Sequence, residues 1–208
     1  MIFPMSDLLD RFIEFMARGG AVMWPLLFMS VLVIALGFER WLYWGVLNRS
    51  VRRHYERFLE ALRSGDRDRV NAIASDDRTP YGSLAERLSE GGDPGAASVE
   101  VVEFQRPRIE RYLLVFSTIV TAAPMLGILG TVLGIIRSFE LLGTQETITD
   151  PRDISAGIAE ALITTAFGLV VALIALVPLM ALRGQVERAL GRFEAMTAAA
   201  TDKFGRRS

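Results

Sequence analysis

Three uninterrupted apolar stretches dominate the pattern of this chain. No charged residue occurs in 19–38, 112–136 or 161–182, which are 20, 25 and 22 residues long. An α-helix rises about 1.5 Å per residue, so each stretch is long enough to cross the roughly 30 Å hydrocarbon core of a bilayer. The pattern therefore predicts an all-α integral membrane protein with three transmembrane helices.

The segments between these stretches predict surface and extramembrane helices. In 1–18 apolar residues recur at helical spacing opposite charged ones, which predicts an amphipathic helix on the membrane surface. Residues 48–111 alternate helical patterns with breakers, of which Gly91-Gly92-Asp93-Pro94-Gly95 is the strongest. We expect a helix from about Ala96 to run through Pro107 into the second span, and the third span to continue into the amphipathic C-terminal segment.

The expected organisation has seven segments. They are a surface helix (1–18), the first transmembrane helix (19–47), a helical domain (48–111), the second transmembrane helix (112–141), a loop (142–156), the third transmembrane helix (157–182) and a C-terminal helix (183–208).

Basic residues indicate the orientation. Twelve arginines lie in 49–111, whereas 142–159 holds only Arg152 and 1–18 holds only Arg11 and Arg18. Because short loops rich in Lys and Arg stay in the cytoplasm, we expect the domain 48–111 and the C-terminus to be cytoplasmic. The N-terminus and the loop 142–156 are then periplasmic, and long second and third helices extend into the cytoplasm.

Composition removes several classes of function. The 23 basic and 24 acidic residues give a net charge of −1, so nothing favours nucleic-acid binding. With no cysteine and His54 as the single histidine, a thiolate, iron–sulfur or histidine-cluster metal site is not expected. No nucleophile or acid–base pair stands out, so we expect neither an enzyme nor a cofactor.

Glu160 is the candidate for chemistry, because it opens the third apolar stretch. A carboxylate at the centre of a bilayer costs about 2.5–3.5 kcal/mol by insertion scales, so such a residue faces a protein interior or a water-filled cavity and indicates ion movement. Helical geometry places Thr164 one turn beyond Glu160, and Thr165 adds a second hydroxyl. The alternative is a first-turn carboxylate that is favoured by the helix dipole at a wet interface.

Small and weakly polar residues form a stripe on each of the last two spans, at spacings of three or four. The stripes are Thr121, Pro124, Gly127, Thr131, Gly134 and Ser138, then Gly157, Glu160, Ala161, Thr164, Gly168, Ala172 and Ala175. Such stripes allow close helix packing in lipid, and packing alone is one interpretation of them. Charges at span ends, namely Arg137 with Glu140 and Glu39 with Arg40, are expected to be interfacial.

Three segments of the chain resemble the MotA/TolQ/ExbB proton-channel family, most closely its ExbB and TolQ branch. They are Gly20 to Trp44 with Trp24-Pro25-Leu26 and Glu39-Arg40, Ala123 to Gly134, and Gly157 to Pro178. The resemblance implies a subunit of a proton-motive-force-driven motor of the bacterial inner membrane. It also implies a homopentamer whose second and third spans line a pore around two ExbD- or TolR-like helices, each with a membrane aspartate. A TonB- or TolA-like protein is a further candidate partner, beside the lipid bilayer.

The same resemblance assigns roles by position. Thr131 matches the family's pore threonine in the second span, Glu160 the acidic residue of the third, and Thr165 its threonine. Helical geometry places Thr164 on the same helix face as Glu160, whereas the motif match favours Thr165, so both threonines remain candidates. The expected transported ion is H⁺, with TonB-type uptake or Tol-Pal-type envelope maintenance as the process.

Two other interpretations stay open at this stage. The motor could drive gliding or secretion, or the chain could be a structural membrane scaffold in which the stripes only pack helices and no ion moves.

Overall fold

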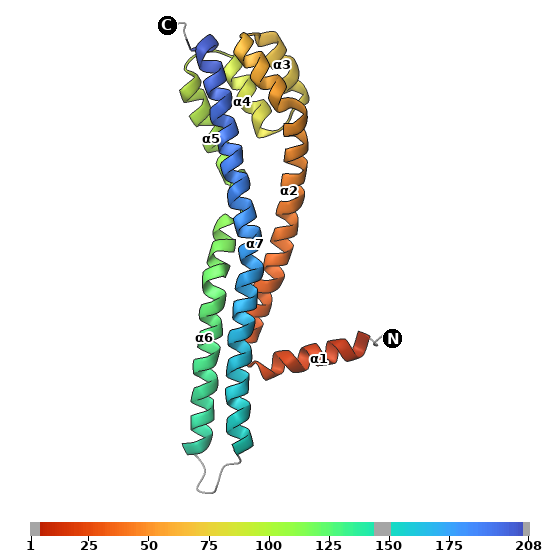
Figure 1. The fold of residues 1–208 in the computed structure, drawn as a ribbon, viewed down its shortest axis with the longest axis vertical. Coiled ribbons are helices and arrows are strands. Elements are labelled where there is room, and N and C mark those ends of the chain that lie inside the picture. The colour runs from red at the N-terminus through yellow and green to blue at the C-terminus, as the bar shows by residue number, and fades with distance from the viewer. Residues whose placement is uncertain (1–4, 144–150, 206–208) are drawn as a thin grey trace. The chain divides into compact units, whose positions relative to one another are not determined.

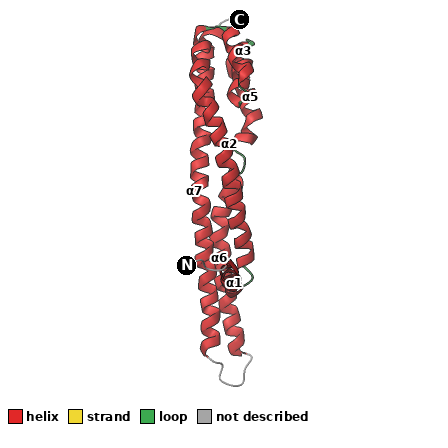
Figure 2. Cartoon of the chain, turned by 90° about the vertical axis from the view of Figure 1, so that its right-hand side faces the viewer, coloured by secondary structure: helices red, strands yellow, loops and turns green. Residues whose placement is uncertain are grey.

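A computed structural model describes residues 5–143 and 151–205 of the chain. Within these ranges it contains seven α-helices and no strand (Figures 1 and 2), which confirms the all-α class. The helices are α1 (Met5–Arg18), α2 (Met23–Ser64), α3 (Arg67–Asp76), α4 (Pro80–Ser89), α5 (Pro94–Ile109), α6 (Leu113–Gly143) and α7 (Pro151–Phe204).

Three of these helices carry segments long and apolar enough to cross a membrane. The segments are Met23–Arg49 in α2, Leu113–Glu140 in α6 and Gly157–Phe204 in α7. They cover most of the three charge-free stretches of the sequence, so the prediction of three transmembrane helices is confirmed.

The chain divides into two compact units, and both are discontinuous in sequence. The first, called here the membrane unit, comprises Met1–Gly37 and Leu114–Leu179, and the second, the helical unit, comprises Phe38–Leu113 and Met180–Ser208. Both α2 and α7 therefore contribute one part of their length to each unit.

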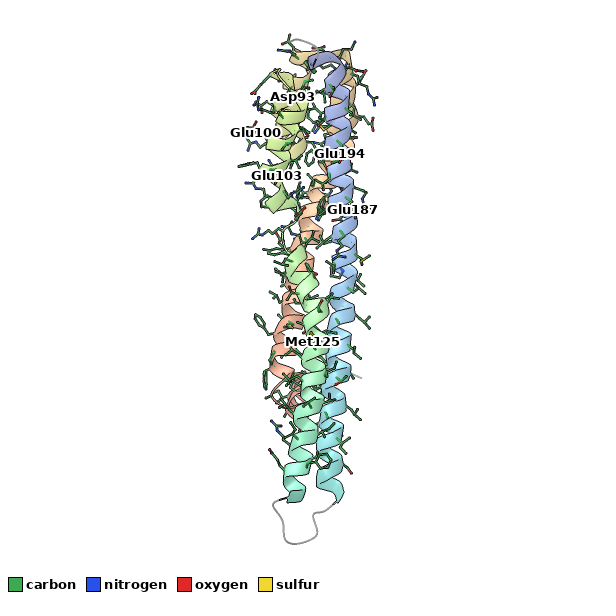
Figure 3. The ribbon with its side chains drawn as sticks, turned by 90° about the vertical axis from the view of Figure 1, so that its left-hand side faces the viewer. Asp93, Glu100, Glu103, Met125, Glu187 and Glu194 are labelled. Atoms are coloured by element: carbon green, nitrogen blue, oxygen red, sulfur yellow. The ribbon has the colours of Figure 1, made fainter. Side chains whose placement is uncertain are left out.

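The membrane unit is built on the pair α6 and α7, which lie side by side (Figures 1 and 2). The helix α1 crosses the direction of this pair in Figure 1 and touches α7 through Phe15, whose ring lies edge-on to that of Phe167 at 6.2 Å. Large apolar side chains cover much of the outer surface of the unit, including Phe28, Val177 and Met125, which is labelled in Figure 3. This surface suits lipid or other membrane helices rather than water.

The helical unit has an aromatic core. Phe58, Tyr81 and Phe193 are buried, and the rings of Tyr81 and Phe193 are 4.9 Å apart. Two aspartates start its short helices, because Asp66 Oδ1 accepts a hydrogen bond from Arg69 N and Asp93 Oδ1 accepts one from Gly95 N. These N-caps satisfy backbone donors that have no partner within the helix.

The expected helix from Ala96 through Pro107 into the second span is wrong. The helix α5 ends at Ile109, α6 begins at Leu113, and Tyr112 between them has a φ of 69°. That left-handed conformation is rare for a residue with a side chain, and it interrupts a right-handed helix. Pro107 itself lies inside α5. In contrast, α7 is one helix through Pro178, as the C-terminal amphipathic pattern predicted.

Arg40 holds this interruption in place. It was expected to be an interfacial charge, but only 2% of it is exposed. Its Nη1 donates to the carbonyl oxygen of Arg108 at 2.9 Å, which satisfies a group at the end of α5. Its guanidinium lies over the rings of Tyr43 and Tyr112, 4.6 and 5.1 Å from their centroids, while Nε pairs with Glu39.

Candidate functional site

The two predicted stripes of small residues face each other in a seam between α6 and α7 of one chain. A Cβ atom added to Gly168 would lie 2.6 Å from the carbonyl oxygen of Ala123, and one added to Gly127 would lie 3.0 Å from Thr165 Cα. A Cβ on Gly134 would lie 2.8 Å from the Cβ of Ala161. The glycines therefore let the two backbones touch, which is how membrane helices pack without large side chains.

Pro124 lies in α6, one of the two helices that form this seam. It is half-buried, one turn before Gly127, inside the continuous helix α6. Proline has no backbone N–H, so α6 lacks one hydrogen-bond donor at this position.

Thr164 is fully buried, with 0% of the residue exposed. Its Oγ1 donates to the carbonyl oxygen of Gly19 at 2.7 Å and is 3.0 Å from that of Glu160. The hydroxyl thus connects α7 to the turn before α2. Helical geometry placed Thr164 one turn beyond Glu160, and the structure shows that its side chain points into the protein.

Thr165 and Thr131 have different surroundings. Thr165 Oγ1 donates to the carbonyl oxygen of Gly127 across the seam at 2.8 Å, and Thr131 Oγ1 donates to that of Ile128 within α6 at 2.5 Å. Both residues are only partly buried. Since each hydroxyl gives its proton to the backbone, its oxygen retains lone pairs that can accept a hydrogen bond from another group.

Glu160 forms an ion pair with Arg137. Arg137 Nη1 donates to Glu160 Oε1 at 3.0 Å, with 54% of the Arg137 side chain and 26% of the Glu160 side chain exposed. The sequence grouped Arg137 with Glu140, but the structure adds Glu160 on the facing helix. Two antiparallel helices joined by a short loop have their adjoining ends at one level. Arg137 and Glu160 are 23 positions apart on the two sides of such a loop, and this spacing is the sequence signal that could have paired them.

The helix-dipole interpretation of Glu160 is wrong. The helix α7 begins at Pro151, so Glu160 lies beyond the first turn, where the dipole effect has faded. Its carboxylate is instead held by a cation.

A glycine turn completes the surroundings of this ion pair, and sequence reasoning missed it. Gly20 has a φ of 71°, and a Cβ atom there would overlap Glu160 Oε1. The positive φ favours glycine at this position, whereas the nearby Oε1 is the movable end of a side chain. The pair Gly19-Gly20 directly before an apolar stretch was the signal that could have revealed it.

The site thus combines a charge pair near one end of an apolar hairpin with hydroxyls along the hairpin. Among the described residues no group of three or more His, Cys, Asp or Glu side chains could hold a metal ion. Three apolar helices, a glycine seam and a partly exposed ion pair beside it are the features of a polytopic membrane protein.

Comparison with known proteins agrees with this class. The MotA/TolQ/ExbB proton channel family matches residues 95–195. An ExbB-like protein 3 of Synechocystis sp. is 33% identical over 161 residues, which cover 74% of this chain and 77% of that protein. An ExbB-like protein 1 of the same organism is 35% identical over 81% of this chain and 68% of its own length. The Tol-Pal system protein TolQ of Pseudomonas aeruginosa is 33% identical over 51% of this chain and 49% of its own.

The chain belongs to the MotA/TolQ/ExbB proton channel family, close to ExbB and TolQ. Together with three apolar helices, this membership identifies a bacterial inner-membrane protein and a motor subunit of the proton-channel type.

Proposed function

We propose that this chain is the pore-forming subunit of an ExbB/TolQ-type motor, which couples proton flow to mechanical work on the cell envelope. The observation that supports this best is the ion pair between Arg137 and Glu160 in the α6–α7 hairpin. Both residues lie inside candidate membrane spans, and ionisable residues within spans commonly mark an ion pathway.

One chain cannot enclose a pore with a single hairpin, so we propose a homo-oligomer, a pentamer by the resemblance. The apolar outer surface of the membrane unit supports contacts with further copies. The pore would surround single-span ExbD- or TolR-like partners, and a TonB- or TolA-like protein would receive the force. The relatives named for biopolymer transport and for the Tol-Pal system support either role.

In the proposed mechanism the mobile charge belongs to a partner aspartate rather than to Glu160. Because Arg137 already compensates Glu160, that carboxylate contributes a fixed, neutralised pair where protons enter. Protonation of the partner aspartate lowers the cost of moving its helix past the apolar wall. The oxygens of Thr131 and Thr165 can accept the hydrogen bond of the protonated acid. Each proton that moves down 100 mV supplies about 2.3 kcal/mol.

The proposed orientation follows the arginines. The N-terminus and the loop 142–156 would be periplasmic, and 48–111 and the C-terminus would be cytoplasmic. The helix α1, which crosses the direction of α6 and α7 (Figure 1), would then lie on the periplasmic surface.

The first test measures proton uptake into proteoliposomes that contain this chain and its one-span partner, driven by an imposed potential. Glu160→Gln and Thr131→Val should abolish uptake and leave the oligomer intact on native mass spectrometry. The matched control is Glu187→Gln, which makes the same change on an exposed part of α7 outside the membrane unit. Full uptake in Glu160→Gln would refute the assignment.

A second test asks whether Arg137 and Glu160 act as a unit. If they do, Arg137→Gln alone, which leaves an uncompensated carboxylate, should lose as much uptake as Glu160→Gln does. Uptake close to wild type in Arg137→Gln would show that the two residues act separately.

A structural scaffold is the second candidate function, and one observation favours it. The hydroxyls of Thr131, Thr164 and Thr165 all donate to backbone carbonyls of this chain, as a purely packing role requires. Under this hypothesis no variant changes ion movement, and only assembly responds.

A further inference from the structure

The helical unit contains a groove beside the part of α2 that ends the first apolar span. It has a volume of about 480 Å³, and α2, the segment before α4, and the end of α5 supply its lining. All of its lining residues belong to this one unit.

One wall of the groove is apolar and continues the span. Leu42 and Val46 lie one helical turn apart on α2, and 49% and 68% of them are exposed. Both fall inside the membrane-crossing segment Met23–Arg49. A lipid acyl chain that lies along this part of α2 would therefore contact the apolar wall of the groove.

Two arginines add positive charge to the lining of the groove. Arg78 and Arg108 line the groove and are exposed, and in the described part of the chain neither guanidinium has an ion-pair partner. The one acid in the lining, Glu39, already pairs with Arg40 at 2.9 Å and with Arg111 at 4.0 Å. The uncompensated charge at the groove is thus positive.

The start of α4 adds polar groups to the lining of the groove. Thr79 precedes Pro80 at the helix start, and its side chain makes no capping hydrogen bond. Its Oγ1 is buried and has no hydrogen-bond partner among the described residues. The beginning of a helix carries a partial positive charge and favours an anion.

We propose that this groove binds an anionic phospholipid. Its phosphate would lie at Arg78, Arg108 and the start of α4, and the first part of one acyl chain along Leu42 and Val46. An apolar wall next to two uncompensated arginines matches an amphiphile with a negative head, whereas a small soluble anion would leave the wall unused. The proposal rests on the proposed function for the orientation that puts this groove at the cytoplasmic leaflet.

The test is native mass spectrometry of the purified, delipidated oligomer, titrated with phosphatidylglycerol or with phosphatidylcholine of the same acyl chains. Wild type should bind phosphatidylglycerol more tightly. In Arg78→Gln/Arg108→Gln the affinity for phosphatidylglycerol should fall by on the order of tenfold, and that for phosphatidylcholine, whose choline offsets the charge of its phosphate, should fall less. The control Arg53→Gln/Arg57→Gln removes the same charge from exposed positions of α2 outside the groove and should leave both affinities as in wild type.

A second variant, Val46→Trp, fills the apolar wall and keeps both arginines, so binding of both lipids should weaken. Equal binding of the two lipids by wild type, or an equal loss in both double variants, would overturn the proposal. A changed number of subunits in Arg78→Gln/Arg108→Gln would also overturn it, because the groove would then be an interface between copies. Failure of the proposed function would appear separately, as absent proton uptake with lipid binding intact.

Discussion

The two units of this chain expose different kinds of side chain. The membrane unit exposes large apolar side chains such as Phe28 and Val177, although it buries Thr164 and Ser138. In the helical unit Phe58 and Tyr81 are buried, and acidic residues such as Glu100 and Glu187, both labelled in Figure 3, are exposed. The contrast teaches that each unit is organised for its own solvent, although α2 and α7 run through both.

The source of stability should differ accordingly. Removing apolar area from water stabilises a domain in water by about 25 cal/mol per Å². Lipid offers no such gain, so close backbone contact and hydrogen bonds between helices have to hold the membrane unit together. Variants that remove one kind of interaction should therefore act mainly on one unit.

The largest effect is expected from Phe58→Ala in the core of the helical unit. Phe58 is 0% exposed, so its truncation removes apolar burial and leaves a cavity, at a cost of about 3–5 kcal/mol. The control Phe104→Ala, at a residue 74% exposed in the same unit, should change the free energy of unfolding by less than about 0.5 kcal/mol. Denaturant unfolding followed by circular dichroism measures both, and equal effects would contradict a water-driven core.

The next effect is expected from Gly168→Ala in the membrane unit. The added Cβ would lie 2.6 Å from the carbonyl oxygen of Ala123, so α6 and α7 must separate, at about 1–3 kcal/mol. Gly191→Ala, on the same helix but in the helical unit, has no atom within 4 Å of its Cβ. It should stabilise by up to about 1 kcal/mol. Unfolding in mixed micelles with increasing SDS tests the pair, and the same sign for both variants would refute the close seam.

Thr164→Val tests hydrogen bonding in lipid and should have a smaller effect. It keeps the shape of the side chain and leaves the carbonyl oxygen of Gly19 without its donor, at about 0.6–1.7 kcal/mol. Thr118→Val, which loses a bond only to Leu114 within its own helix at an exposed position, is the control. The same SDS titration applies, and indistinguishable variants would mean that the long-range bond adds nothing.

The smallest effect is a dependence on alkaline pH in the helical unit. Burial raises the pKa of Tyr81 above its ordinary value of 10.0. The folded state therefore keeps the phenol proton to a higher pH than the unfolded state, so this stabilisation is present below pH 10.0 and lost above it. The decrease in thermal stability between pH 9 and pH 11 should be smaller in Tyr81→Phe than in wild type. An identical decrease would show that Tyr81 does not contribute.

The sequence predicted those features that depend on position along one helix. The charge-free stretches predicted the three transmembrane helices. The spacing of small residues predicted the two stripes that form the seam between α6 and α7. The positions of Glu160, Thr131 and Thr165 followed from their motifs, and their roles in ion movement remain predictions. In each case the signal was local, because solvent and helical period act on neighbouring residues.

The features that the sequence did not predict depend on contacts between distant segments. The left-handed Tyr112 is held by Arg40 from another helix, and Arg137 finds Glu160 only across the hairpin. The turn at Gly20 likewise lies against the Glu160 carboxylate, which comes from the distant helix α7. One sequence alone gives no measure of which distant groups meet.

The hydrogen bond from Thr164 to Gly19 also has a consequence for how the protein is made. It joins positions 145 apart, whereas Thr165 and Gly127 are only 38 apart. During synthesis the hairpin of α6 and α7 can close soon after α7 enters the bilayer. Each unit joins an earlier segment of the chain to a part of α7, so neither can be completed before translation reaches α7. We therefore expect the first span to wait in the bilayer through most of translation, and its glycine turn to dock last.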